Sequence, residues 1–152
     1  MKVRIYAKSR VDLNEKVGAY AYLLDDYIAQ LPGAKGFKKP IRTMAQADCM
    51  AYVNALSILS KTAAAEELET LEVVTDSGVV IELLEVFKFQ KHCDDIAKCW
   101  RENIKPLFVK LREIKFIKID RKPLAGDPHT FNMQKCEVAA TQALDRLRDI
   151  TK

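Results

Sequence analysis

Apolar and polar residues follow two different periods along the chain, and each period predicts a different element. Alternation with a period of two, or a short apolar run, predicts strands that are at least half buried. We expect strands at residues 2–7, 17–24, 71–75 and 115–120. The first two are expected to pair as a hairpin across the polar, turn-like residues 8–16. A further short strand is expected within or just after the loop from Pro32 to Pro40.

Apolar residues spaced three or four positions apart predict helices. The expected helices cover residues 47–61, 76–87, 94–114 and 132–148. Pro106 interrupts the third, and because proline suits the first turn of a helix, we expect a new helix to begin there. The residues of the last helix expected to face inward are Val138, Ala139, Leu144 and Leu147. This order predicts an α/β protein with a mixed sheet covered by helices, in a single domain over residues 1–152.

One acidic residue stands at an expected junction between a strand and a helix. The apolar strand at residues 71–75 ends at Asp76, and the next helix is expected to follow at once, with Thr75 or Asp76 as its cap. The Asp76 carboxylate is therefore expected at a strand end beside a helix N-terminus. Its chemistry depends on how many other carboxylates the fold brings to the same place.

Composition is typical of a globular protein of the cytoplasm. Apolar residues make up 49% of the chain, which is enough to form a core. No apolar run approaches the roughly 20 residues needed to cross a bilayer, so no membrane association is expected. The four cysteines are scattered and form no CxxC pair, which is typical of reduced thiols and predicts a cytoplasmic location.

Positive charge is concentrated in one region of the sequence. Residues 88–122 hold eleven Lys or Arg against five Asp or Glu, whereas residues 1–87 hold ten against twelve. A regional excess of this kind is typical of a surface that binds phosphate groups. A solvated helix face laced with opposite charges gives the same count, and the charge alone does not decide between the two interpretations.

Five short motifs, in order, resemble the ribonuclease H family over almost the whole chain. Residues 5–10, Ile-Tyr-Ala-Lys-Ser-Arg, stand where the first strand of the family ends in an Asp-Gly-Ser motif, and residues 18–24 match its glycine-containing second strand. Residues 43–56 are similar to its first helix, Thr-Asp-Ser at residues 75–77 to its second acidic motif, and residues 136–143 to its final helix. The resemblance implies a ribonuclease H-like α/β fold, with a five-stranded mixed sheet and helices on both faces.

The resemblance also implies a chemistry. Ribonuclease H enzymes use four carboxylates to hold two magnesium ions, which act on a phosphodiester of the RNA strand in an RNA/DNA hybrid. By motif, the catalytic and metal-binding positions fall on Asp48, Asp76 and Glu137, where Asp48 replaces a glutamate and Glu137 an aspartate. The fourth position, an aspartate at the end of the first strand, falls on Lys8. An ammonium group there removes a ligand and adds a positive charge, so the carboxylate set departs from that of the family.

Two rearrangements of this centre are open. In the first, Lys8 pairs with Asp76 or Glu137 and converts the metal site into an internal salt bridge. In the second, Asp12 swings in from the loop beyond Ser9 as a replacement ligand.

The resemblance indicates a region for nucleic-acid contacts as well. The candidates are Lys98, Trp100, Arg101 and Lys105, which occupy the region of the family's basic, tryptophan-containing helix. Trp100 suits a role as a core aromatic equally well. The two asparagines before the first helix of the family correspond to Met44 and Ala45, which cannot bond to sugar or base edges. His129 is the candidate for the family's mobile histidine, in the loop that begins at Pro123, and a lone His in such a loop is more often a bystander.

Three functions remain open at this point. The favoured one is a ribonuclease H-like nucleic-acid-binding protein whose cleavage of RNA in hybrids is weak or lost because of Lys8. The alternative is an active ribonuclease H that cuts the RNA strand of RNA/DNA hybrids with an atypical ligand set and requires magnesium or manganese. A protein-interaction module with a protein partner is a further alternative, because one fold hosts many functions.

Overall fold

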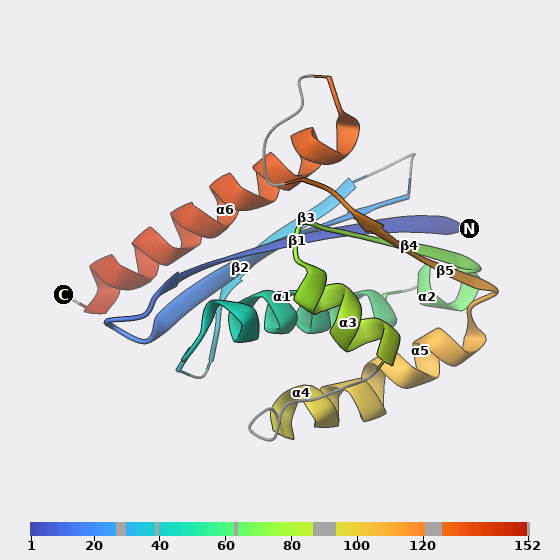
Figure 1. Ribbon diagram of the computed structural model, residues 1–152, viewed down its shortest axis with the longest axis horizontal. Coiled ribbons are helices and arrows are strands. Elements are labelled where there is room, and N and C mark those ends of the chain that lie inside the picture. The colour runs from blue at the N-terminus through green and yellow to red at the C-terminus, as the bar shows by residue number, and fades with distance from the viewer. Residues whose placement is uncertain (27–29, 39, 63, 87–93, 121–125, 152) are drawn as a thin grey trace.

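A mixed sheet forms the centre of the protein in a computed structural model that describes residues 1–26, 30–38, 40–62, 64–86, 94–120 and 126–151 (Figure 1). Its strands are β1 (Lys2–Asp12), β2 (Val17–Asp25), β3 (Gln30–Gly36), β4 (Thr70–Thr75) and β5 (Glu113–Lys118), in the spatial order β3-β2-β1-β4-β5. The β1–β2 and β2–β3 pairs are antiparallel, whereas the β1–β4 and β4–β5 pairs are parallel. The predicted five-stranded mixed sheet is confirmed.

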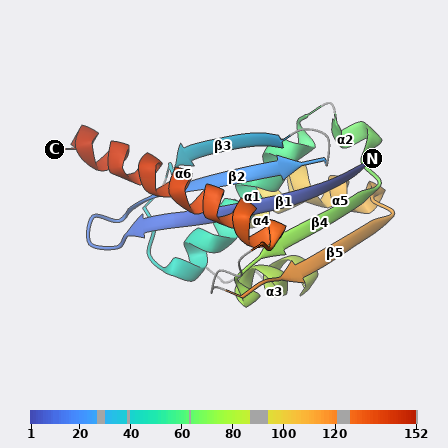
Figure 2. The ribbon, with the colours of Figure 1, turned by 90° about the horizontal axis from the view of Figure 1, so that it is seen from above.

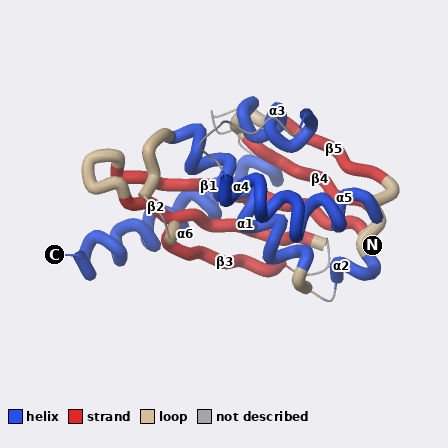
Figure 3. The backbone as a smooth tube through the Cα atoms, turned by 90° about the horizontal axis from the view of Figure 1, so that it is seen from below, coloured by secondary structure: helices blue, strands red, loops and turns tan. Residues whose placement is uncertain are grey.

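Helices cover both faces of this sheet. They are α1 (Met44–Ser60), α2 (Ala64–Glu67), α3 (Gly78–Val86), α4 (Asp94–Cys99), the π-helix η1 (Trp100–Ile104), α5 (Lys105–Lys110) and α6 (Pro128–Thr151). Helix α6 crosses one face over β1, β2 and β3 (Figure 2), and α1 packs on the other face. Helices α4, η1 and α5 lie outside α1 as a further layer (Figure 3). Among the described residues, no helix has both the length and the apolar character required to span a membrane.

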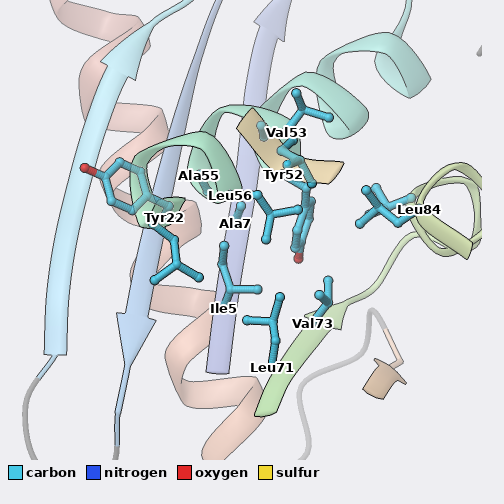
Figure 4. Packing of buried hydrophobic residues seen from close by; sticks show 14 of the residues in the cluster. Ile5, Ala7, Tyr22, Tyr52, Val53, Ala55, Leu56, Leu71, Val73 and Leu84 are labelled. Carbon is cyan, nitrogen blue, oxygen red and sulfur yellow. The ribbon is translucent and has the colours of Figure 1, made fainter. Parts of the chain in front are cut away.

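The main core lies between β1, β4 and α1. Side chains alternate along a strand, so Ile5 of β1 and the pair Leu71 and Val73 of β4 point to the same face of the sheet. Figure 4 shows them packed beneath Tyr52 and Leu56 of α1, and all five are buried. The Tyr52 hydroxyl also donates a hydrogen bond to the Val74 carbonyl oxygen at 2.5 Å, which fixes α1 to the central strands.

Several element boundaries differ from the prediction. Strand β1 continues to Asp12, because the polar residues that were predicted to form a turn keep their pairing with β2. Strand β5 and helix α6 begin earlier than predicted, at Glu113 and Pro128. The four-residue helix α2 was not predicted, because so short a segment shows no period. The expected strand between β2 and α1 is β3, whose proline is tolerated because β3 is an edge strand.

The predicted inward face of α6 needs one correction. Leu144 is buried and Leu147 packs against its cluster, but Val138 is 57% exposed. Successive helical residues are rotated by about 100°, so Val138 lies roughly 200° from both Cys136 and Ala140, which face the sheet. Val138 is therefore on the solvent side of the helix.

Candidate functional site

Asp76 lies where the sequence placed it, between the end of β4 and the start of α3. Thr75 caps this turn, because its Oγ1 accepts a hydrogen bond from the Ser77 backbone N–H at 3.0 Å. The Asp76 carboxylate instead faces β1, where the Lys8 ammonium donates to Oδ2 at 2.6 Å. The first of the two predicted rearrangements is therefore observed in the geometry: Lys8 and Asp76 form a partly buried salt bridge.

Three successive residues of β1 contact the three predicted carboxylates. Beside the Lys8–Asp76 pair, Ser9 donates a hydrogen bond to Asp48 Oδ1 at 2.8 Å, and the Arg10 guanidinium forms an ion pair with Glu137. Lys8 and Arg10 face α6, and Ser9 faces α1, because side chains alternate along the strand. We call these six residues the carboxylate site.

The carboxylates of this site are already paired with side chains of β1, an arrangement that does not favour a pair of divalent cations. A metal ligand must offer free oxygen lone pairs, and Mg²⁺ requires near-octahedral oxygen coordination. Here one oxygen of each carboxylate already accepts from an ammonium, a hydroxyl or a guanidinium group. Among the described residues, no group of three or more His, Cys, Asp or Glu side chains is arranged to hold a metal ion. The metal-binding and catalytic roles of Asp48, Asp76 and Glu137 stay predictions.

Asp12 does not serve as a replacement ligand in this arrangement. It is the last residue of β1, and its Oδ1 accepts hydrogen bonds from the backbone N–H groups of Asn14 and Glu15 at 3.0 and 3.1 Å. Its Oδ2 lies 3.2 Å from Nη2 of Arg148 in α6. The carboxylate therefore stabilises the β1–β2 turn and anchors α6.

His129 lies in the first turn of α6 rather than in the preceding loop. Its Nδ1 is 2.7 Å from the hydroxyl of Tyr6, a buried residue of β1. Burial raises the pKa of the Tyr6 hydroxyl above its ordinary value. The His129 backbone N–H is held by Asp127 Oδ1 at 3.1 Å, so the residue is fixed at both ends.

A further cation stands near the start of α3. Lys118, the last residue of β5, places its Nζ 3.9 Å from the position that a Cβ on Gly78 would occupy. Gly78 is two residues beyond Asp76. Two strands that flank β4 thus each bring a lysine to the region around Asp76.

The predicted nucleic-acid contacts divide into two kinds. Lys98, Arg101 and Lys105 are exposed on the outer helices. Trp100 is only 6% exposed, and its ring meets Phe108 edge-on with 5.1 Å between the ring centroids. Trp100 therefore belongs to the core, as its alternative interpretation predicted, and its contact with nucleic acid stays a prediction.

Ser9 and Arg10 were not recognised from the sequence as members of the site. A signal was present, because alternation continues beyond residue 7, with Lys8, Arg10 and Asp12 in phase with Lys2 and Arg4. Treating residues 8–16 as a turn concealed it.

The comparisons with known proteins identify the fold. No protein-family model and no curated protein matches the sequence. Among solved structures, the N-terminal RNase H domain of rv2228c from Mycobacterium tuberculosis, solved as a fusion with maltose binding protein, has 18% identity and a TM-score of 0.70, with 99% of each chain covered. RNase H1 from the halophilic archaeon Halobacterium salinarum NRC-1 has 19% identity and a TM-score of 0.64, with 96% of this chain and 99% of that one covered.

A third solved structure carries a nucleic acid. LC11-RNase H1 in complex with an RNA/DNA hybrid has 15% identity and a TM-score of 0.67, with 95% of this chain and 98% of that one covered. These likenesses extend over nearly the whole chain and agree with the strand order and helix layers described above. The protein has a ribonuclease H-like fold, as the sequence motifs predicted.

Proposed function

We propose that this protein binds nucleic acid through its ribonuclease H-like fold and cleaves the RNA strand of RNA/DNA hybrids weakly or not at all. The observation that carries the proposal is the Lys8 ammonium, 2.6 Å from Asp76 Oδ2. A divalent cation at Asp76 would have to displace this ammonium and then remain near it. Two unit charges about 4 Å apart near a protein surface interact by about 4 kcal/mol, and a divalent ion doubles the repulsion.

The other two carboxylates support the same conclusion. Glu137 is paired with Arg10, so a second cation offsets the charge that would attract a metal. Asp48 is held by Ser9. A two-metal reaction depends on both ions clamping the attacking and leaving oxygens, and positioning errors of about 1 Å cost roughly a hundredfold in rate. Magnesium or manganese is therefore expected to support little turnover.

Nucleic-acid binding is supported by two independent features. LC11-RNase H1, which has the same fold, was solved with an RNA/DNA hybrid bound. Lys98, Arg101 and Lys105 of this chain are exposed on α4, η1 and α5, where they can contact phosphates. A duplex such as an RNA/DNA hybrid is thus the proposed partner.

Binding can be tested with a fluorescently labelled RNA/DNA hybrid titrated at several salt concentrations. We expect the affinity to fall with salt, since each phosphate contact of a duplex contributes about 0.9 to the slope of log Kobs against log salt. Replacing Lys98, Arg101 and Lys105 by Ala is expected to weaken binding and flatten this slope. A matched control replaces Lys35, Lys61 and Arg146 by Ala, which removes the same charge from exposed positions on β3, the end of α1 and α6.

The same labelled hybrid tests whether the protein cleaves the RNA strand. We expect little or no cleavage in Mg²⁺ or in Mn²⁺. Cleavage that disappears in the Asp76→Asn variant would establish the alternative, an active ribonuclease H with an atypical ligand set. A wild-type protein that binds neither the hybrid nor duplex DNA would leave the protein-interaction module as the better account.

A further inference from the structure

Lys8 and Arg10 form a pair of cations on one face of the sheet. Because they are two residues apart on a strand, their Cα atoms are roughly 6.6 Å apart, which is comparable with the spacing of successive phosphates along one nucleic-acid strand. Their side chains are 19% and 39% exposed, so both are accessible from solvent. The pair therefore lies at the surface of the carboxylate site.

Both cations have donor capacity beyond their salt bridges. An ammonium group has three N–H donors and a guanidinium group has five. Lys8 donates to one oxygen of Asp76, and Arg10 uses Nη2 toward Glu137. A ligand that offers several acceptor oxygens, such as a phosphate group, would match these donors.

The two cations reduce the repulsion that the carboxylates of the site would exert on such a ligand. Lys8 and Arg10 offset the charges of Asp76 and Glu137, and Asp48 accepts a hydrogen bond from Ser9. A phosphate would be repelled by a group of uncompensated carboxylates unless cations were bound there first. Here the chain supplies the cations itself.

We propose that Lys8 and Arg10 bind successive backbone phosphates of the nucleic acid directly, in the place where divalent cations would otherwise mediate the contact. This inference rests on the proposed nucleic-acid-binding function and adds a contact site to it. It makes hybrid binding independent of divalent cations. It also makes β1, at the centre of the sheet, part of the nucleic-acid interface.

The test measures binding of the labelled hybrid by the wild type and by Lys8→Gln and Arg10→Gln variants, in EDTA and in Mg²⁺ at matched ionic strength. The wild type is expected to bind at least as tightly in EDTA. Each glutamine variant is expected to lose roughly three- to tenfold in affinity and about 0.9 in salt slope. The conservative Lys8→Arg and Arg10→Lys variants are expected to keep the wild-type slope, which a purely structural role would not require.

Lys2→Gln is the matched control. Lys2 lies on the same face of β1, is 41% exposed and also pairs with a buried acid, Glu72. Its loss is expected to leave hybrid affinity unchanged. If the wild type binds but requires Mg²⁺, or if the two glutamine variants bind like the wild type, the direct contact is wrong while the proposed function stands. If the wild type binds no hybrid, both are wrong.

Discussion

At the scale of single residues, three neighbours on β1 determine what the surrounding carboxylates can do. The sequence placed a lysine where the family has an aspartate and predicted a pair with Asp76 or Glu137. In the structure, Lys8 forms its salt bridge with Asp76, and Arg10 forms one with Glu137. The sequence alone could not decide, because the pairing depends on the strand register, and a shift by one residue would move each side chain to the other face.

Glu72 is expected to make the stability of the protein depend on pH. This buried acid of β4 forms an ion pair with Lys2 and accepts from Arg4 Nε at 3.1 Å. Burial raises the pKa of Glu72, but the two cations lower it further, so that the pKa lies below its ordinary value. A lowered folded-state pKa gives stability that is present above the unfolded pKa of about 4.3 and is lost as pH falls through the folded value.

We therefore expect the wild type to lose thermal stability between about pH 5 and pH 2 more steeply than a Glu72→Gln variant. Circular dichroism melting curves across this range give the comparison. Glu82→Gln, which changes an exposed acid of α3, is the control and is expected to follow the wild type. Parallel curves for the wild type and Glu72→Gln would show that this ion pair does not contribute.

Among the elements, the helix start at Pro106 was predicted from the sequence, but the π-helix before it was not. The prediction that a new helix begins near this proline is confirmed, since α5 begins at Lys105. The preceding π-helix was not predicted. Proline lacks an N–H and its ring clashes with the carbonyl four residues earlier, so the chain widens there, and the Lys105 N–H donates to the Trp100 carbonyl oxygen. No residue pattern specifies this adjustment in advance.

Gly33 of the edge strand β3 packs so closely against Tyr22 of β2 that a larger residue is not expected to fit. A Cβ on Gly33 would lie 2.2 Å from Cζ and Oη of Tyr22 on the neighbouring strand. Gly33→Ala is therefore expected to destabilise the protein by about 1–3 kcal/mol through overpacking, measured as a lower urea midpoint. Gly78→Ala is the control, since its nearest neighbour is Lys118 Nζ at 3.9 Å. Equal midpoints for both variants would contradict this packing account.

For the whole molecule, the order of helices and strands could be predicted from the sequence. The contacts of the carboxylate site could be predicted only in part. Solved structures with 15–19% identity share this fold with TM-scores of 0.64–0.70, so the pattern of apolar positions carries more of the fold than residue identity does. Asp48, Asp76 and Glu137 were located from motifs. Their partners Ser9 and Arg10 were not, because contacts between distant segments follow from sheet pairing rather than from local sequence.

The structure also shows where the positive charges of residues 88–122 lie. Those that are exposed among the described residues are Lys98, Arg101, Lys105, Lys110, Arg112, Lys115 and Lys118. They lie on α4, η1, α5 and the edge strand β5, or between α5 and β5. Lys88, Lys91, Arg121 and Lys122 lie outside the described residues. Because these cations are solvent-exposed, their effect on nucleic-acid binding is expected to decrease with salt.

If the chain's own cations occupy the position of divalent metal ions, the wild type should not bind Mn²⁺, and isothermal titration calorimetry measures this binding. The wild type is compared with Lys8→Asp, which introduces an aspartate at the position where the resemblance to ribonuclease H predicts one, and with Asp76→Asn. We predict no binding isotherm for the wild type at concentrations that saturate Lys8→Asp. Mn²⁺ binding by the wild type that is lost in Asp76→Asn would contradict the claim, and no gain of binding in Lys8→Asp would show that residue 8 is not the metal position.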